Sequence, residues 1–224
     1  MSNYIEAIAI VEGKTEQIFI EKVLAPYLGR KNIFMTATQV SKPGQKGGDV
    51  KFSRTLKDIR NHLNQRSETV VCTFVDYYGT KEWPGVNNLA ANASPADIAS
   101  AVNKASHAAV LEQYPHLQSD KRYIPYFAVH EFEALLFSDS HVLAKKLSID
   151  VDEVNAVLGL CGEPEAINNS PQTSPSKRLD NWCNGKFKKT TAGIAIAEEI
   201  GISNIRDKCS VFNSWLNQLE ALVG

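Results

Sequence analysis

Hydrophobic positions follow two patterns along this chain. Short uninterrupted apolar runs alternate with longer segments in which apolar residues recur every three or four positions, and these patterns predict strands and helices respectively. Strands are expected at 4–11, 33–40, 69–75 and 123–129. The run at 4–11 is continuous in apolar type, as is typical of a central strand buried on both faces of a parallel sheet, whereas 33–40 alternates between apolar and polar residues. The β-branched run TVVCTFV at 69–75 is the strongest of the four.

Helices are expected between these strands and throughout the last third of the chain. Those between the strands are predicted at 15–28, with Thr15 as the N-cap, at 52–63, at 95–113 and at 131–137. Further helical segments are predicted at 140–146, 151–160, 175–182, 191–199 and 208–222. Strands that alternate with helices predict an α/β fold, here a Rossmann-like, mostly parallel sheet of about four strands flanked by helices.

Length and composition agree with this arrangement. A chain of 224 residues with 43% apolar residues suits one sizeable domain. We expect residues 1–137 to form the α/β core and residues 138–224 to form a helical extension packed on it, as one structural unit. The formal net charge of −1 gives no global sign of nucleic acid, so a nucleic-acid partner would need a local basic patch.

No part of the sequence suggests export or membrane insertion. The start of the chain lacks a basic segment followed by a long apolar one, and no apolar run approaches the roughly 20 residues of a membrane helix. The four cysteines are scattered, with no C-x-x-C pair: Cys72, Cys161, Cys183 and Cys209. We therefore expect a soluble cytoplasmic protein with reduced thiols.

Acidic residues stand at the ends of three predicted strands. Glu12 follows the first strand, Asp76 the third, and the pair His130-Glu131 the fourth. The carboxyl ends of parallel strands meet at one edge of a sheet, where ligands bind, so these acids should converge. Carboxylates that close repel one another, and a hard cation such as Mg²⁺ or Mn²⁺ would relieve the repulsion. The pattern therefore predicts a metal or catalytic site.

The residues after the first strand allow more than one interpretation. Gly13 permits a tight turn with close backbone approach. Glu16 is either a further ligand or a charge favoured at the start of a helix. Gly13-Lys14-Thr15 resembles the end of a phosphate-binding P-loop, but that motif needs a glycine where Ile8 stands. A nucleotide-hydrolysing P-loop is therefore excluded.

Two further positions stay open. Tyr78 lies where a second acid after Asp76 would help to hold a pair of metals, although packing under the loop around Trp83 is the simpler role. Among the acids after the fourth strand, one should face the cleft and the other should be structural. We favour Glu131 for the cleft because it is nearer the strand end. His130 and Glu133 would share a helix face and are accessory candidates.

Basic residues gather in two stretches that could contact phosphates, although a solvated surface explains any single lysine. The later stretch contains Lys177, Arg178, Lys186, Lys188 and Lys189, and the earlier one Lys42, Lys46, Lys51 and Arg54. With Lys14, these are the candidate nucleic-acid contacts. A lysine near a cleaved phosphate would also stabilise charge in the transition state.

Taken together, these motifs resemble the Toprim fold of topoisomerases, bacterial primases and the overcoming-lysogenization-defect nucleases. Val11-Glu12-Gly13 is similar to the Toprim strand that ends in Glu-Gly, and Glu16 is similar to the additional acid of the nuclease branch. Asp76 matches half of the Asp-x-Asp motif, with Tyr78 at the second aspartate. The whole chain resembles Toprim-like bacterial proteins of the domain-of-unknown-function 4276 type, through VEGKTE, FVDYYG, HEFEALLFSD, SPSKRL and GKFKKTTAGIAIAEEIG.

The resemblance implies a magnesium-dependent phosphoesterase site. It implies that Glu12 is a general acid/base or metal ligand, that Glu16 and Asp76 are metal ligands, and that Glu131 or Glu133 completes the set. It also implies a catalytic role for Lys188 or Lys189, and a partner ATPase of the ABC type in anti-phage defence. Tyr78 leaves one-metal and two-metal chemistry both open.

Three functions of different kinds follow from these expectations. The leading hypothesis is a Mg²⁺- or Mn²⁺-dependent nuclease that cleaves phosphodiester bonds in DNA or RNA. The alternative is a catalytically degenerate Toprim subunit that binds a partner ATPase or a phage trigger without cleaving, and the missing second aspartate motivates it. A primase-like nucleotidyl transfer is the third, and the sequence offers no separate nucleotide-binding motif for it.

Overall fold

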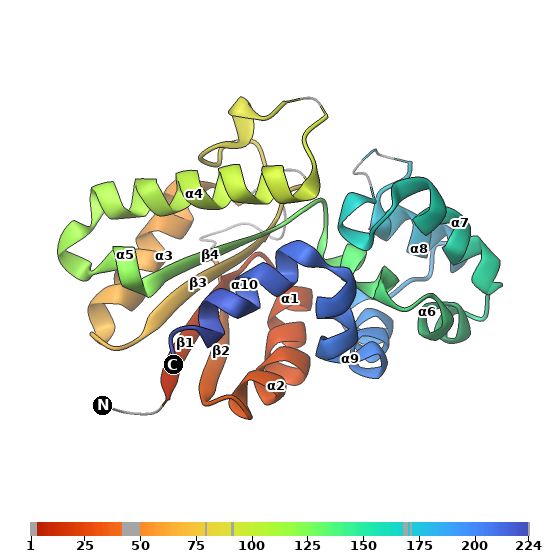
Figure 1. The fold of residues 1–224 in the computed structure, drawn as a ribbon, viewed down its shortest axis with the longest axis horizontal. Helices are drawn as coiled ribbons and strands as arrows, with labels where there is room; N and C mark the ends of the chain where they lie inside the picture. The colour runs from red at the N-terminus through yellow and green to blue at the C-terminus, as the bar shows by residue number, and fades with distance from the viewer. Residues whose placement is uncertain are drawn as a thin grey trace.

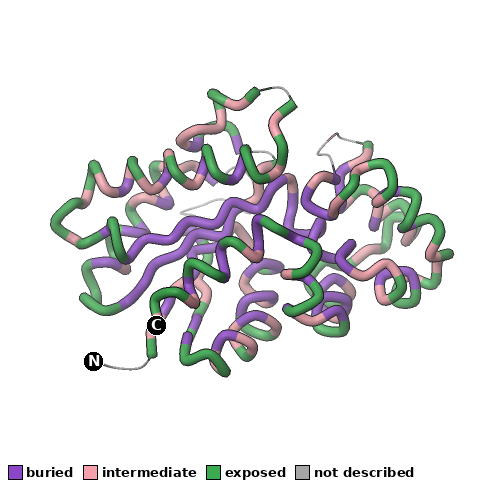
Figure 2. The backbone as a smooth tube through the Cα atoms, in the orientation of Figure 1, coloured by how far each residue is buried: buried purple, intermediate pink, exposed green. Residues whose placement is uncertain are grey.

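Four parallel strands form one sheet in the order β2-β1-β3-β4 (Figure 1). The computed structural model describes residues 4–41, 50–78, 80–90, 92–167, 170 and 172–223. The strands are β1 (Ile5–Val11), β2 (Ile33–Gln39), β3 (Val70–Asp76) and β4 (Tyr123–Ala128). The α/β prediction is confirmed, and each strand lies within a residue of its predicted bounds. β3 and β4 are buried almost throughout (Figure 2), as their mostly apolar sequences require, whereas only two of the seven residues of the edge strand β2 are buried.

Helices surround the sheet and make up most of the second half of the chain. The α-helices are α1 (Lys14–Phe19), α2 (Ala25–Gly29), α3 (Phe52–Gln65), α4 (Pro95–Gln113), α5 (Ser119–Arg122), α6 (Ser140–Leu147), α7 (Val151–Cys161), α8 (Pro175–Trp182), α9 (Ile194–Lys208) and α10 (Ser210–Glu220). Short 3₁₀ segments are η2 (Val86–Asn88), η3 (Pro115–Leu117), η4 (Phe132–Ser138) and η5 (Pro164–Ala166). Two π-helical turns are η1 (Ile20–Leu24) and η6 (Lys189–Gly193).

Both faces of the sheet are covered by helices. α3 and α4 lie on one face, and α1, α2 and α10 lie on the other (Figure 1). The aromatic core on the second face joins distant parts of the sequence: the ring of Trp215 in α10 stacks on Tyr126 of β4 at 4.8 Å, and Tyr126 meets Phe74 of β3 at 4.8 Å. The last helix is therefore part of the α/β core, while α6, α7, α8 and α9 form a helical lobe beside it.

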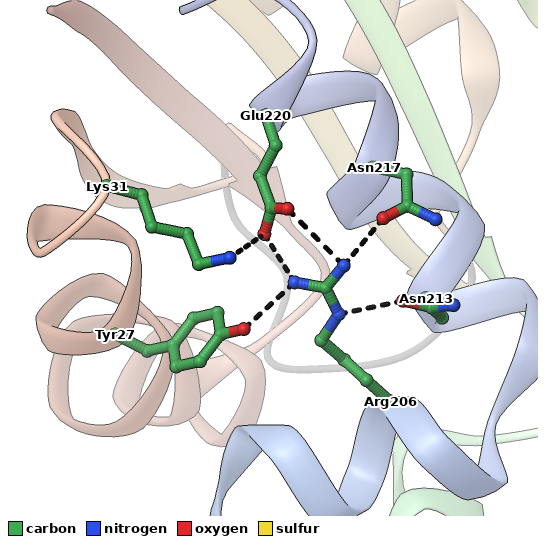
Figure 3. A network of polar contacts seen from close by, with 6 residues as sticks. All are labelled: Tyr27, Lys31, Arg206, Asn213, Asn217 and Glu220. Carbon is green, nitrogen blue, oxygen red and sulfur yellow. Dashed lines mark hydrogen bonds and ion pairs between the residues drawn. The ribbon is translucent and has the colours of Figure 1, made fainter.

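A polar network joins α9 and α10 to α2 (Figure 3). The Arg206 guanidinium donates to Tyr27 Oη at 2.9 Å, to Asn213 Oδ1 at 2.7 Å and to Asn217 Oδ1 at 2.6 Å. It also pairs with Glu220, which accepts a second ion pair from Lys31 at 3.0 Å. The Arg206 side chain is only 12% exposed, and its charge is held by partners that come from two other helices, α2 and α10.

Several local predictions need correction. The first helix begins at Lys14 after Gly13, so Thr15 is not its N-cap, and it passes through η1 before α2. The helix predicted at 131–137 is the tighter η4, which begins only at Phe132. The helix predicted at 191–199 continues to Lys208 as α9, with a break at Gly201, whose φ is 78°.

Two general features complete the fold. Among the described residues, no helix combines the length and the apolar character needed to cross a membrane. The four cysteines have free thiols, with Cys72 and Cys209 buried.

Candidate functional site: an acidic cluster at the sheet edge

Four carboxylates gather at the carboxyl-terminal edge of the two central strands. β1 and β3 are neighbours, with Val11 paired to Phe74, so Glu12 and Asp76 leave the sheet side by side. α1 contributes Glu16, and η4, which follows β4, contributes Glu133. The carboxylates of Glu16, Glu133 and Glu12 all act electrostatically on Asp76. The convergence of strand-end acids expected for a parallel sheet is thus present.

Asp76 is the centre of this group. Its Oδ1 accepts a hydrogen bond from the backbone N–H of Phe132 at 3.0 Å, which fixes the carboxylate toward η4. Burial, followed by the negative charges of the neighbouring acids, raises the pKa of Asp76 well above its ordinary value, and the Lys189 ammonium opposes this effect. The carboxylate of Asp76 is therefore held in a place where its negative charge is costly unless a cation is near.

Glu16 is placed by a close approach to the backbone of the preceding turn. Its Oε2 accepts a hydrogen bond from the Gly13 N–H at 2.8 Å, and a Cβ on Gly13 would lie 3.2 Å from the same oxygen. Gly13 has φ −149°, which any residue adopts, so the glycine is required for space and not for a left-handed turn. Glu16 is only 8% exposed and combines both expected roles, a helix-start charge and a member of the acidic cluster.

The structure exchanges the expected roles of Glu131 and Glu133. Both Glu131 oxygens accept hydrogen bonds from Ser176, Oε2 from its N–H at 2.8 Å and Oε1 from its hydroxyl at 2.9 Å. Glu131 therefore secures the first turn of α8. Glu133 is 1% exposed and acts electrostatically on Asp76. The preference for Glu131 as the acid facing the cleft needs correction, because the 3₁₀ geometry of η4 turns Glu133 toward Asp76.

Lys189 supplies the positive charge of the cluster. Its Nζ lies 2.9 Å from Glu133 Oε1. Burial raises the pKa of Glu133 in spite of the Lys189 ammonium. Burial lowers the pKa of Lys189, but the carboxylates of Glu133, Glu131 and Asp76 outweigh it, so that the net shift is upward. Lys188 and Lys189 are both exposed, but it is Lys189 whose ammonium pairs with a clustered acid.

The other candidates beside the cluster have different surroundings. His130 has φ 69° and precedes η4, so it does not share a helix face with Glu133 as predicted. Its ring packs against Tyr77 at 5.9 Å, and burial lowers its pKa to about 4. The backbone N–H of Tyr78 donates to His130 O at 2.9 Å, but the Tyr78 side chain is 42% exposed. At the position where a second acid after Asp76 would help to hold a pair of metals, the chain thus offers the Tyr78 phenol and no carboxylate.

The predicted nucleic-acid contacts are dispersed. Lys51 is paired with Glu82 at 3.0 Å, Lys14 donates to Gln17 Oε1 at 3.3 Å, and Arg178 donates to Thr173 O at 2.8 Å. Arg54 is partly exposed and Lys177 is exposed, whereas Lys42 and Lys46 fall outside the described residues. Three of the described members, Lys14, Lys51 and Arg178, are thus held by neighbours within the protein itself.

Two cavities differ in their relation to the cluster. A small one of about 240 Å³ is lined by Ser176, Lys177, Asp180, Phe187 and Lys189, and so reaches the lysine of the site. A larger one of about 830 Å³ lies between α4, α10 and the amino-terminal half of β4, and none of the clustered acids line it. Of these two cavities, the smaller one is thus the one that borders the cluster, through Lys189.

The donor set fits a hard divalent cation in its chemistry. In the described part of the chain, no three acidic, histidine or cysteine side chains converge closely enough to hold a metal ion in this conformation. The cluster nevertheless offers only carboxylate oxygens, the type that Mg²⁺ and Mn²⁺ prefer. Glu133 Oε1 faces the Lys189 ammonium, and the buried Oε2 accepts no hydrogen bond from the described residues.

The fold and the site define a class of α/β proteins with a parallel sheet and a buried acidic cluster at its carboxyl edge. Over residues 11–220 the chain matches the family described as Domain of unknown function (DUF4276). Because the match covers nearly the whole chain, this protein belongs to that family. The matched region contains the clustered acids and Lys189. Searches of curated proteins and of solved structures found no match.

Proposed function

We propose that this protein is a metal-dependent nuclease of the Toprim type that hydrolyses phosphodiester bonds in DNA or RNA. The observation that carries the proposal is the group of Glu12, Glu16, Asp76 and Glu133, two of them buried, which meets the Lys189 ammonium at the carboxyl edge of a parallel sheet. Such a group is unfavourable in a protein interior without cations. The Glu-Gly strand end and the order of the acids support the Toprim relationship.

Glu12, Glu16 and Asp76 would hold Mg²⁺ or Mn²⁺. When bound, the ion would polarise phosphate oxygens and lower the pKa of a bound water. Glu16 and Asp76 are oriented for this role because one oxygen of each already accepts a backbone hydrogen bond. Without a cation, the raised pKa of Asp76 favours the protonated carboxyl group. Its proton would lie on Oδ2, because Oδ1 accepts the hydrogen bond from the Phe132 N–H.

Lys189 would bind and neutralise the phosphate of the substrate. Its side chain is 46% exposed although its Nζ reaches a buried carboxylate, so the ammonium connects the acidic cluster with the surface. The adjacent cavity includes Lys177, a second cation. Oriented cations of this kind stabilise the charge that develops on phosphate oxygens during in-line displacement.

The partners are part of the proposal. We infer from the Toprim resemblance that the nuclease works with an ATPase of the ABC type in anti-phage defence. The dispersed basic residues would contact nucleic acid outside the site, with Lys14 nearest to the acids in sequence.

Cleavage of plasmid DNA and of single-stranded RNA, with Mg²⁺ or Mn²⁺ and with EDTA, tests the proposed activity. Asp76→Asn and Glu12→Gln should each lower the metal-dependent rate by at least about a hundredfold. Each variant replaces a carboxylate that would hold the cation and so stabilise the transition state. Glu112→Gln, an exposed acid of α4, is the matched control and should keep the wild-type rate. Equal cleavage by all of these proteins would refute the site.

A degenerate subunit that binds a partner without cleaving is the second candidate function, and the exposed Tyr78 side chain at the position of a second acid favours it. The two candidates separate in the same experiment, run with and without the ATPase encoded nearest to this gene. A stable complex that never cleaves nucleic acid, in either divalent metal, would favour the degenerate subunit.

A further inference from the structure

The larger cavity, of about 830 Å³, lies between α4, α10 and the amino-terminal half of β4, and the proposed nuclease makes no use of it. We propose that this cavity binds a mononucleotide whose base carries an amino group. Its volume falls in the usual range of small-molecule sites, roughly 300 to 1,000 Å³. The inference goes beyond the proposed function and stands apart from it, because none of the clustered acids line the cavity.

The walls of the cavity are the two helices that run along β4 (Figure 1). Small side chains line both of them: α4 contributes Ala96, Ala99 and Ser100, and α10 contributes Ser210 and Ser214. Residues three or four positions apart share one face of a helix, so each helix turns a face of short side chains toward the cavity. The space is thus enclosed by three regular elements of the fold.

The buried part of the lining is apolar and partly aromatic. Trp215, Tyr123 and Pro125 line the cavity and are buried. The Trp215 ring is held in place by stacking on Tyr126 at 4.8 Å, and the Tyr123 ring lies nearly parallel to His107, with an angle of 15° between the ring planes. A flat ligand can therefore pack against side chains that are already ordered, which lowers the entropy cost of binding.

Hydrogen-bond acceptors in the same lining favour a ligand that carries amino groups. Asn103 Oδ1 is buried and accepts no hydrogen bond from the described residues. β4 is the last strand of the sheet, and its Ala128 carbonyl faces β3, where it accepts the Tyr77 N–H at 2.9 Å. Because successive residues of a strand bond to opposite sides, the carbonyls of Tyr123 and Pro125 face away from β3, at the edge where the cavity lies.

Positive charges gather at the end of the cavity where β4 begins. α5 leads directly into β4 and carries Lys121. His107 of α4 reaches the same place, with Nε2 3.3 Å from the Asp120 carbonyl, and Lys104 precedes it by about one turn. Neither lysine forms an ion pair with a described residue. Asp120 is the one acid beside them in the lining, so the net charge at this end favours an anion.

An amino-bearing mononucleotide combines the three features that the cavity selects: a flat base, an amino donor and an anionic phosphate. An extended peptide would also meet the carbonyls at the β4 edge, but strand addition needs donors from that edge as well. Pro125 has no N–H to donate, and it faces this edge, as prolines in sheets commonly do. The proline therefore favours a small ligand over an added strand.

Calorimetric titration with AMP in EDTA tests the inference without metal and without activity. The wild type should bind one AMP per chain, at least about tenfold more tightly than IMP, which has an oxygen in place of the amino group. Adenosine, which lacks the phosphate, should also bind at least about tenfold more weakly than AMP. Asn103→Leu should remove most of the preference for AMP over IMP, because the buried acceptor is lost.

Two exposed positions of the lining allow variants with matched controls. Ser214→Phe fills the cavity and Lys104→Met removes a cation, so each should weaken AMP binding by at least about fivefold. Ser203→Phe on α9 and Lys57→Met on α3 change exposed residues that line neither cavity and should bind AMP as the wild type does. If Ser214→Phe does not fold, Ser100→Phe fills the cavity from the opposite wall.

The outcomes separate this site from the acidic cluster. No binding of AMP, or equal binding of AMP and IMP, would overturn the inference and leave the proposed nuclease standing. Asp76→Asn should bind AMP like the wild type, and a loss in that variant would overturn the inference by placing AMP at the cluster. Tighter binding of a single-stranded oligoadenylate than of AMP would also overturn it, because the ligand would then be a strand and not a mononucleotide.

Discussion

At the scale of single residues, the site depends on small spaces and on particular oxygens. Gly13 illustrates this, since its backbone donates to Glu16 Oε2 at 2.8 Å and leaves 3.2 Å for any added methyl group. A glycine in ordinary extended backbone thus determines where an acidic side chain can lie. The glycine is part of the geometry of the cluster although it contributes no functional group.

Gly13→Ala should lower the affinity for Mn²⁺ by about tenfold, because the new Cβ displaces the Glu16 carboxylate by a few tenths of an ångström. The free energy of unfolding should change by less than about 1 kcal/mol, since the φ of −149° at Gly13 suits alanine. Titration calorimetry and urea unfolding measure the two effects. Gly29→Ala is the control, because nothing lies within 4 Å of its added Cβ. Unchanged Mn²⁺ affinity in Gly13→Ala would contradict this account of Glu16.

The sequence was sufficient to predict that Glu12 and Asp76 lie in the cluster, but not to predict which acid after β4 joins them. Glu12 and Asp76 directly follow apolar runs, so the strand ends alone place them at one edge. The choice between Glu131 and Glu133 depends on whether residues after β4 form an α-helix or the tighter η4, and the local pattern does not distinguish these. Lys189 is separated from Glu133 by more than 50 positions of the sequence, so only the tertiary structure shows that they pair.

At the scale of elements, strands and long helices were predictable and short irregular turns were not. The runs at β1 and β3 are mostly apolar, and Pro95 and Pro175 mark the starts of α4 and α8, whose predicted bounds match the structure. The π-helical turns η1 and η6 have no comparable signature, because a single wider turn leaves the three- or four-residue spacing of apolar positions nearly unchanged.

The start of α10 shows how one buried acid can control an element. Glu165 of η5 accepts hydrogen bonds from the N–H groups of Val211 at 2.8 Å and Phe212 at 3.0 Å, at the amino-terminal end of the helix. Burial raises the pKa of Glu165 to about 7, although these two hydrogen bonds oppose the shift. A carboxyl whose pKa is raised on folding binds more protons in the folded state, so stability falls as the pH rises from the unfolded pKa to the folded one.

We therefore predict that Glu165 lowers the free energy of unfolding between pH 4.5 and 7. The loss should reach about 3 kcal/mol at pH 7, from a shift of roughly 2.5 units. Glu165→Gln should flatten this part of the pH profile while keeping one helix-capping oxygen, and urea unfolding at pH 5, 6 and 7 would show it. Glu163→Gln is the neighbouring control. Parallel profiles for wild type and Glu165→Gln would contradict the prediction.

At the scale of the whole molecule, Arg206 joins layers that are far apart in sequence. Its guanidinium connects α9 with Tyr27 of α2 and with Asn213, Asn217 and Glu220 of α10 (Figure 3). Several charge-assisted hydrogen bonds with one mostly buried cation stabilise more than isolated surface pairs do. The network therefore fixes α10 on the sheet.

Arg206→Met should lower the free energy of unfolding by about 2 to 4 kcal/mol, because Glu220 and the asparagines lose a shared charged donor. Chemical denaturation measures the loss, and Arg60→Met, at an exposed position of α3, should cost less than about 0.5 kcal/mol. Mn²⁺ affinity should stay within about twofold of the wild type, since the network lies apart from the acids. Equal stability of the two variants would mean that the network contributes nothing.

The place of α10 in the core also has a consequence for the order of events during synthesis. Phe74 is covered in part by Phe19 and Phe132, but Tyr126 obtains the ring of Trp215 only after about ninety further residues have been made. Until then one face of the nascent sheet exposes aromatic rings, which is the kind of surface that chaperones bind and that promotes aggregation. Residues 210–220 must therefore leave the ribosome before α10 can cover this face of the sheet.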